Sequence, residues 1–165
     1  MRQAVSIVFK SLVVVIIQTT LVHFLSFEGI FPDLVLIWIV YLAITEGQAT
    51  AVTSGFALGL IVDMMSGKDG MLGLAALTGT TAGFVAGFFH DENRISSILV
   101  GYQFLLVVAV TSFVHSILYF FIFLQGTDTS VLDTLLSYGL PTTLYTTVVA
   151  LLPMLVFSRR LSSTL

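Results

Sequence analysis

The carboxylate of Asp63 is the strongest candidate for chemistry in this sequence, because it ends an apolar run. It follows Gly55 and Gly59 at intervals of four residues, so the three share one side of a helix. An ionised aspartate in hydrocarbon is costly and must face protein or water, or be protonated. Three roles are open for Asp63: an acceptor for the amides of the next turn or for Lys68, a contact with a partner, or a coupling-ion site.

A second polar group lies in another apolar stretch, where Thr111, His115 and Tyr119 are spaced four residues apart. A further histidine, His23, follows Thr19 by the same interval. Neither histidine has a carboxylate or a second histidine four residues away, so the spacing predicts no metal site. We expect both to form hydrogen bonds, with Thr19, Thr111 or Tyr119 as partners.

Several classes of chemistry are excluded by composition. The chain has no cysteine, which removes disulfides, thiol catalysis and thiolate metal sites. Its net charge of −3 argues against nucleic acid as a partner. The segment around Lys68 lacks the spacing of a phosphate-binding loop, and no Gly-x-Ser-Gly setting is present for a membrane protease. The sequence therefore predicts no catalytic residue, no bound metal and no cofactor.

The elements that position these residues are membrane helices. Hydrophobic residues make up 57% of 165 and charged residues 9%, whereas soluble domains have roughly 25% charged residues. Because a span needs about 20 residues, the length allows five or six helices and no soluble domain. We predict one all-α membrane domain, residues 1–165, a six-helix bundle with approximate spans 5–27, 33–45, 48–65, 71–89, 95–124 and 135–157.

The second predicted span is short, since 13 residues rise only about 20 Å. It is either buried among its neighbours or joined to the third span as a broken hairpin.

Charge predicts the orientation. Six spans place both termini on one side, and five of the six basic residues then share it: Arg2, Lys10, Arg94, Arg159 and Arg160. The positive-inside rule makes that side cytoplasmic. Most acids, among them Asp33 and Asp128, then fall on the outer face.

Glycines form two ladders with a four-residue period, Gly55 with Gly59 and Gly79 with Gly83 and Gly87. Small residues let helix backbones approach closely in lipid. The ladders therefore either lock helices of this chain together or dock a transmembrane helix of a partner.

The order of these fragments resembles the MreD family of rod shape-determining proteins. The resemblance covers about residues 31–87, through Pro32-Asp33-Leu34, Gly47, Gly55-Phe-Ala-Leu-Gly59-Leu-x-x-Asp63, Ser66-Gly67 and Leu72-Gly-Leu-x-Ala-Leu77. It implies a non-enzymatic scaffold of the bacterial inner membrane that helps position peptidoglycan synthesis. Implied partners are MreC, then MreB, RodA and an elongation-specific penicillin-binding protein, besides membrane lipid and a second copy of the chain.

Within this resemblance, we predict a structural and interaction core of ten residues: Pro32, Asp33, Gly55, Gly59, Asp63, Gly67, Gly73, Gly79, Gly83 and Gly87.

Two alternatives stay open. The family's fold is thought similar to the six-helix substrate-binding subunit of energy-coupling-factor vitamin transporters, which makes such a subunit the second candidate. Those subunits offer small residues on span one, whereas this chain has no glycine or alanine there after Ala4. The third candidate is a small ion-coupled transporter.

Overall fold

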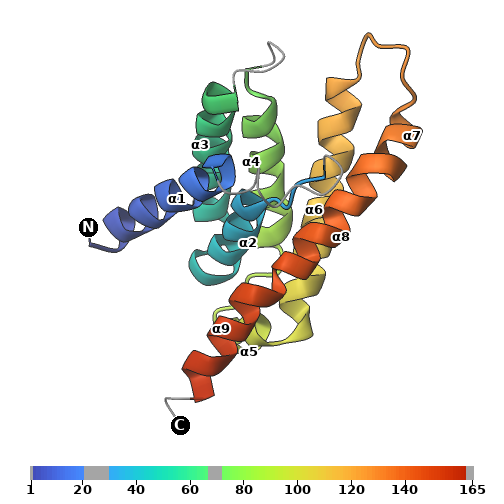
Figure 1. The fold of residues 1–165 in the computed structure, drawn as a ribbon. Helices are drawn as coiled ribbons and strands as arrows, with labels where there is room; N and C mark the ends of the chain where they lie inside the picture. Colours follow the sequence, from blue (N-terminus) through green and yellow to red (C-terminus); the bar gives the residue numbers. More distant parts are fainter. Residues whose placement is uncertain (1, 21–29, 67–71, 163–165) are drawn as a thin grey trace.

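The protein is all-α, and a computed structural model describes residues 2–20, 30–66 and 72–162. Figure 1 shows the helices in chain order. They are α1 (Arg2–Thr20), α2 (Leu34–Glu46), α3 (Gln48–Ser66), α4 (Leu74–Gly87), α5 (Ile95–Val100), α6 (Tyr102–Phe123), α7 (Val131–Thr134), the π-helical turn η2 (Leu135–Gly139), α8 (Leu140–Val149) and α9 (Leu151–Ser162).

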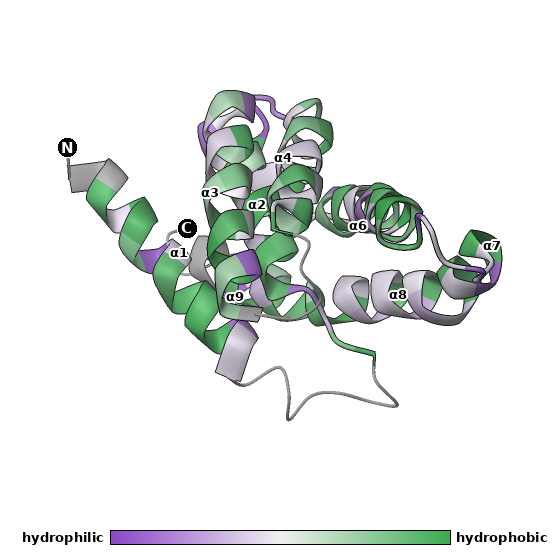
Figure 2. Ribbon diagram, turned by 90° about the horizontal axis from the view of Figure 1, so that it is seen from above, coloured by the Kyte–Doolittle hydropathy of each residue, from purple (hydrophilic) through white to green (hydrophobic). Residues whose placement is uncertain are grey.

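Three helical stretches are long and apolar enough to cross a membrane, at Gln48–Met65, Tyr102–Phe123 and Val131–Arg159. Three shorter apolar helices accompany them, at Val5–Thr20, Leu34–Glu46 and Leu74–Gly87. Figure 2 shows apolar residues along nearly all of these helices. The molecule is a helical membrane protein.

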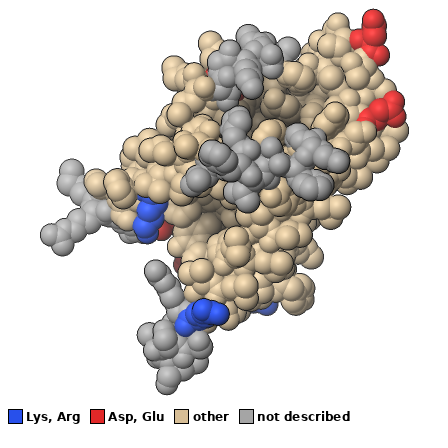
Figure 3. Space-filling view, in the orientation of Figure 1, with Lys and Arg blue, Asp and Glu red and all other residues tan. Residues whose placement is uncertain are grey.

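Few charged side chains are visible on the face drawn in Figure 3. In Figure 3 the acidic side chains on this face lie at the end where α6 leads into α7. Basic side chains lie at the lower end of the view, near the end of α9, and at mid-height on the left, over α1. The broad surface between them is uncharged in this view, as expected for a surface that contacts lipid.

The short helix α2 lies at the centre of the bundle, between α1, α3, α4 and α6 (Figures 1 and 2). Eight of its 13 residues are buried, which is why it reads as an uninterrupted apolar run. Gly47 ends it with φ of +90°, a conformation that favours glycine, and α3 begins one residue later. The short helix α2 is therefore buried among its neighbours, and α3 follows it directly.

The glycine ladders face each other across α3 and α4. A methyl group on Gly79 would lie 2.6 Å from the carbonyl oxygen of Gly55, and one on Gly83 would lie 2.5 Å from that of Ala51. On Gly59 it would meet the backbone of Ala75. The ladders therefore lock two helices of this chain, and their faces leave no room for the helix of a partner.

The predicted helix 95–124 is wrong in one respect, since it is two helices. Gly101, with ψ of 166°, is extended and separates α5 from α6. Glycine favours such a break because it loses more backbone freedom in a helix than other residues.

The predicted span 135–157 is part of a longer bent helix, α7 to α9. Pro141 follows the π-helical turn η2, and Pro153 lacks the N–H that would bond to Val149, where α8 ends. Two predicted features, His23 with the end of span one and the turn containing Gly67 and Lys68, lie outside the described residues.

Candidate functional site: a polar cavity at the start of α2

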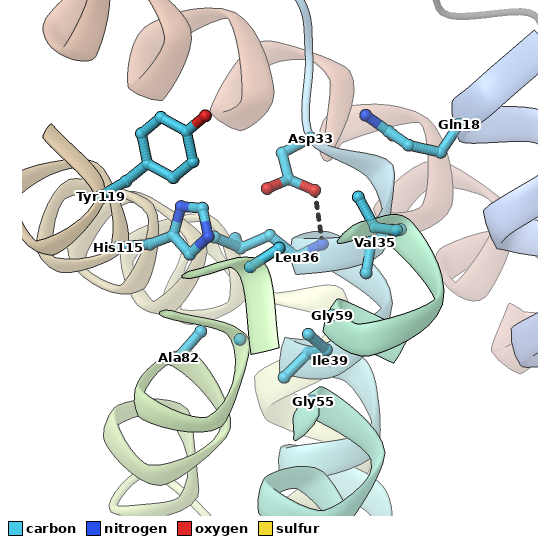
Figure 4. A pocket seen from close by; sticks show the side chains of 13 residues that line it. Gln18, Asp33, Val35, Leu36, Ile39, Gly55, Gly59, Ala82, His115 and Tyr119 are labelled. Carbon is cyan, nitrogen blue, oxygen red and sulfur yellow. Dashed lines mark hydrogen bonds between the residues drawn. The ribbon is translucent and has the colours of Figure 1, made fainter. Parts of the chain in front are cut away.

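A cavity of about 180 Å³ lies where α2 begins (Figure 4). It lies beside the first two turns of α2, where residues of α3, α4 and α6 come together. Its walls come from α1, α2, α3, α4 and α6: Gln18, Asp33, Val35, Leu36, Ile39, Gly55, Gly59, Val62, Ala75, Gly79, Ala82, His115 and Tyr119.

Asp33 is the carboxylate of this cavity and the N-cap of α2. Its Oδ1 accepts a hydrogen bond of 2.8 Å from the backbone N–H of Leu36, which satisfies an otherwise unpaired donor of the first turn. Asp33 is half-buried and lines the cavity, and its place on the outer side of the membrane stays a prediction.

Two distant side chains hold the chain around Asp33. The amide of Gln18 in α1 accepts from the N–H of Leu34 at 2.8 Å and donates to the carbonyl of Pro32 at 3.3 Å. The hydroxyl of Thr146 in α8 accepts from the N–H of Asp33 at 3.0 Å. These bonds fix the position at which α2 begins.

His115 and Tyr119 form the opposite wall, with ring centroids 6.4 Å apart. Figure 4 shows both rings directed toward the region of the Asp33 carboxylate. The histidine ring makes no hydrogen bond to the described residues, which contradicts the expected hydrogen-bonding role. One turn away, the buried hydroxyl of Thr111 also has no partner within the described parts of the chain.

Asp63 lies in a separate site and acts as an acceptor for backbone amides. Its two oxygens accept hydrogen bonds from the N–H groups of Gly73, Ala75 and Ala76 at 2.9 to 3.2 Å. These are amides at the start of α4, which would otherwise lack partners. Gly73 precedes that helix with φ of +101°, which favours glycine. The expected role as an acceptor of turn amides is confirmed.

The predicted core residues divide among three places. Pro32 binds Gln18 beside the cavity, which Asp33, Gly55, Gly59 and Gly79 line. Asp63 and Gly73 begin α4, whereas Gly83 and Gly87 contact Ala51 and Gln48 at the other end of the α3–α4 pair. Gly67 lies outside the described residues.

Sequence reasoning missed three participants. Gln18 and Thr146 were not among the predicted site residues, and His115 was not paired with Asp33. The Asp33 carboxylate and the His115 imidazole line the same cavity, although they come from segments about 80 residues apart. The four-residue spacing of His115 and Tyr119 indicated that these two share a helix face. The contacts of Gln18 and Thr146 join distant segments and leave no pattern in the sequence. In the part of the chain that the structure describes, no three His, Asp or Glu side chains gather to hold a metal ion.

Comparison with known proteins identifies the family. The sequence model described as rod shape-determining protein MreD matches residues 1–161. Neither a curated protein nor a solved structure matches the chain. Because the match covers nearly the whole sequence, including the cavity and both glycine ladders, the chain belongs to the MreD family of rod shape-determining proteins.

Proposed function

We propose that this protein is a non-enzymatic scaffold of the bacterial inner membrane, which binds MreC and helps position peptidoglycan synthesis so that the cell stays rod-shaped. The observation that carries the proposal is the family match over residues 1–161. MreB, RodA and an elongation-specific penicillin-binding protein are the further members of the proposed assembly.

The proposed topology has six membrane passes with both termini in the cytoplasm. It is supported by the distribution of basic residues along the sequence, and by the basic side chains near the end of α9 in Figure 3, opposite the acidic ones near α7. The count of three long and three shorter apolar helices is consistent with six passes.

The glycine packing indicates where partners bind. Since the ladders of α3 and α4 are occupied by each other, contacts with partners fall on the outer apolar faces. The face of α1 is an example, because it exposes large side chains at helical spacing, with Phe9 68% exposed. Such faces suit transmembrane helices of other proteins as well as lipid.

Depletion in a rod-shaped host tests the role in shape. Cells that lose the protein should become round, and restoring it should restore rods. Cells that keep their rod shape after depletion would contradict the proposal.

Disulfide cross-linking tests the contact with MreC. Because this chain has no native cysteine, any cross-link must form at the introduced one. Single cysteines at Phe9, Phe84, Phe113 and Val148 sample exposed faces of α1, α4, α6 and α8. Each is paired with single cysteines along the MreC transmembrane helix, and a cysteine at buried Phe104 is the matched control. At least one exposed position should form a disulfide with MreC while Phe104→Cys does not. A complete set without any cross-link would refute direct helix contact.

The alternative, a vitamin-binding transporter subunit, would use the cavity at α2. At about 180 Å³ the cavity is below the range of roughly 300–1,000 Å³ typical of sites for drug-sized ligands. This size favours the scaffold over the vitamin-binding subunit.

A further inference from the structure

The cavity at α2 has two polar groups that no described residue fully satisfies with a hydrogen bond. The Asp33 carboxylate uses Oδ1 for Leu36, whereas Oδ2 has no partner among the described residues. The His115 ring likewise has no hydrogen-bond or ion-pair partner there, so the two do not pair directly. Polar groups inside a membrane bundle are normally paired, because leaving them unpaired is costly.

The charge of the cavity is one-sided. Asp33 is its carboxylate, and neither lysine nor arginine is among the residues that line it. An ionised aspartate in such a place needs a cation or a proton to compensate it.

The cavity lies away from the end of α6. His115 precedes the last residue of α6 by eight positions, or about 12 Å along the helix. The remaining walls are mainly apolar, with Val35, Leu36, Ile39 and Val62 among them. They suit a short hydrocarbon chain attached to a charged group.

We propose that this cavity binds one primary ammonium group, which donates one N–H to Asp33 Oδ2 and a second to the unprotonated nitrogen of His115. An ammonium ion has three donors and a positive charge, so it satisfies both groups and neutralises the carboxylate. The ring of Tyr119 adds an aromatic surface of the kind that attracts cations. A volume of 180 Å³ equals about six water molecules, enough for an aminoethyl group.

Two sources can supply this chemistry, a small free amine or the aminoethyl headgroup of a phospholipid. In either case the cavity is a ligand site in addition to the scaffold role. Loss of ligand binding at this site would leave the cross-linking of MreC unchanged. The experiments can therefore refute the ligand site without refuting the scaffold role, and the reverse.

Calorimetric titration of the purified full-length protein in phosphatidylcholine nanodiscs tests the site with ethanolamine and choline as probes. Choline carries the same charge but has no N–H donor, so ethanolamine should bind at least about tenfold more tightly. Equal binding of the two probes would overturn the proposal.

Two variants locate the binding. Asp33→Asn keeps an oxygen to accept from Leu36 but loses the charge, and His115→Phe keeps the ring but loses its nitrogens. Each should weaken ethanolamine binding at least about tenfold. Asp128→Asn, at an exposed loop position, is the control and should bind as the wild type does. The fluorescence of the single tryptophan shows whether Asp33→Asn folds. If it does not fold, ethanolamine binding by His115→Phe alone tests the location of the site.

Native mass spectrometry distinguishes the two sources. The protein is transferred to nanodiscs of mixed phosphatidylethanolamine and phosphatidylcholine, then released. Retention of phosphatidylethanolamine by the wild type, with loss in His115→Phe, assigns the site to the lipid headgroup. Binding of ethanolamine without lipid retention assigns it to a free amine. If neither ligand binds the wild type better than His115→Phe, no ammonium site exists.

Discussion

The backbone N–H of Asp33 donates a hydrogen bond of 3.0 Å to the hydroxyl of Thr146, joining residues 113 positions apart. Gln18 binds the residues on both sides of Asp33 from another helix. The start of the central helix α2 is therefore held by α1 and α8 together. Such side-chain bonds are needed because the first amides of a helix lack partners within it.

Replacing Thr146 with valine should destabilise the fold. Valine has nearly the same shape but leaves the N–H of Asp33 unpaired, which costs about 1–3 kcal/mol when the donor is buried. Thr111→Val is the matched control, because that buried hydroxyl has no partner among the described residues and its loss should be neutral or stabilising. The free energy of unfolding in detergent micelles measures both. If Thr146→Val lowered the free energy of unfolding by less than Thr111→Val does, the proposed anchoring role of Thr146 would be contradicted.

Gly59→Ala should separate α3 from α4. The added methyl group meets the backbone of Ala75, which cannot rotate away as a side chain can. Overpacking of this kind costs about 1–3 kcal/mol. Ala57→Leu, at an exposed position two residues earlier on the same helix, is the control. We expect a lower thermal unfolding midpoint for Gly59→Ala only, and equal midpoints would show that the two helices can move apart freely.

Asp63→Ala should weaken the start of α4. It removes the acceptor for three amides, a loss of about 1–3 kcal/mol by analogy with buried caps. Asp63→Asn should be milder, since it keeps one acceptor oxygen. Hydrogen exchange of the α4 amides is the direct measurement, with Asp128→Asn as control. Unchanged protection of Ala75 and Ala76 in Asp63→Ala would rule out this capping role.

Ser11→Ala should change the environment of the single tryptophan. The indole N–H of Trp38 donates to the hydroxyl of Ser11 at 2.8 Å, which ties α2 to α1. The same ring stacks on Tyr41, and Tyr41 stacks on Phe157 of α9. Loss of the bond should shift the tryptophan emission and cost about 1 kcal/mol. Ser97→Ala, whose hydroxyl bonds within its own segment, is the control and should leave the emission unchanged.

The sequence predicted the apolar helices because membrane helices are encoded locally. Runs of apolar residues, Gly47 at a break and the Pro32-Asp33 start each specify backbone conformation through their immediate neighbours. The helices α2 and α3 accordingly begin and end within one residue of the predicted positions. The acceptor role of Asp63 was predictable for the same reason, since its partners lie only 10 to 13 residues away.

Which surfaces meet was decided by the tertiary structure. A four-residue glycine period predicts a close helix contact but does not name the partner, and only the packing of Gly55 against Gly79 shows that the ladders serve each other. The break at Gly101 was missed because one glycine is tolerated in many membrane helices. The cavity depends on Gln18, Asp33 and His115, which come from three separate parts of the chain. The sequence by itself determined the apolar helices and the family, whereas the meeting of Asp33 and His115 at one cavity arose only from folding, because no local pattern encodes which distant segments come together.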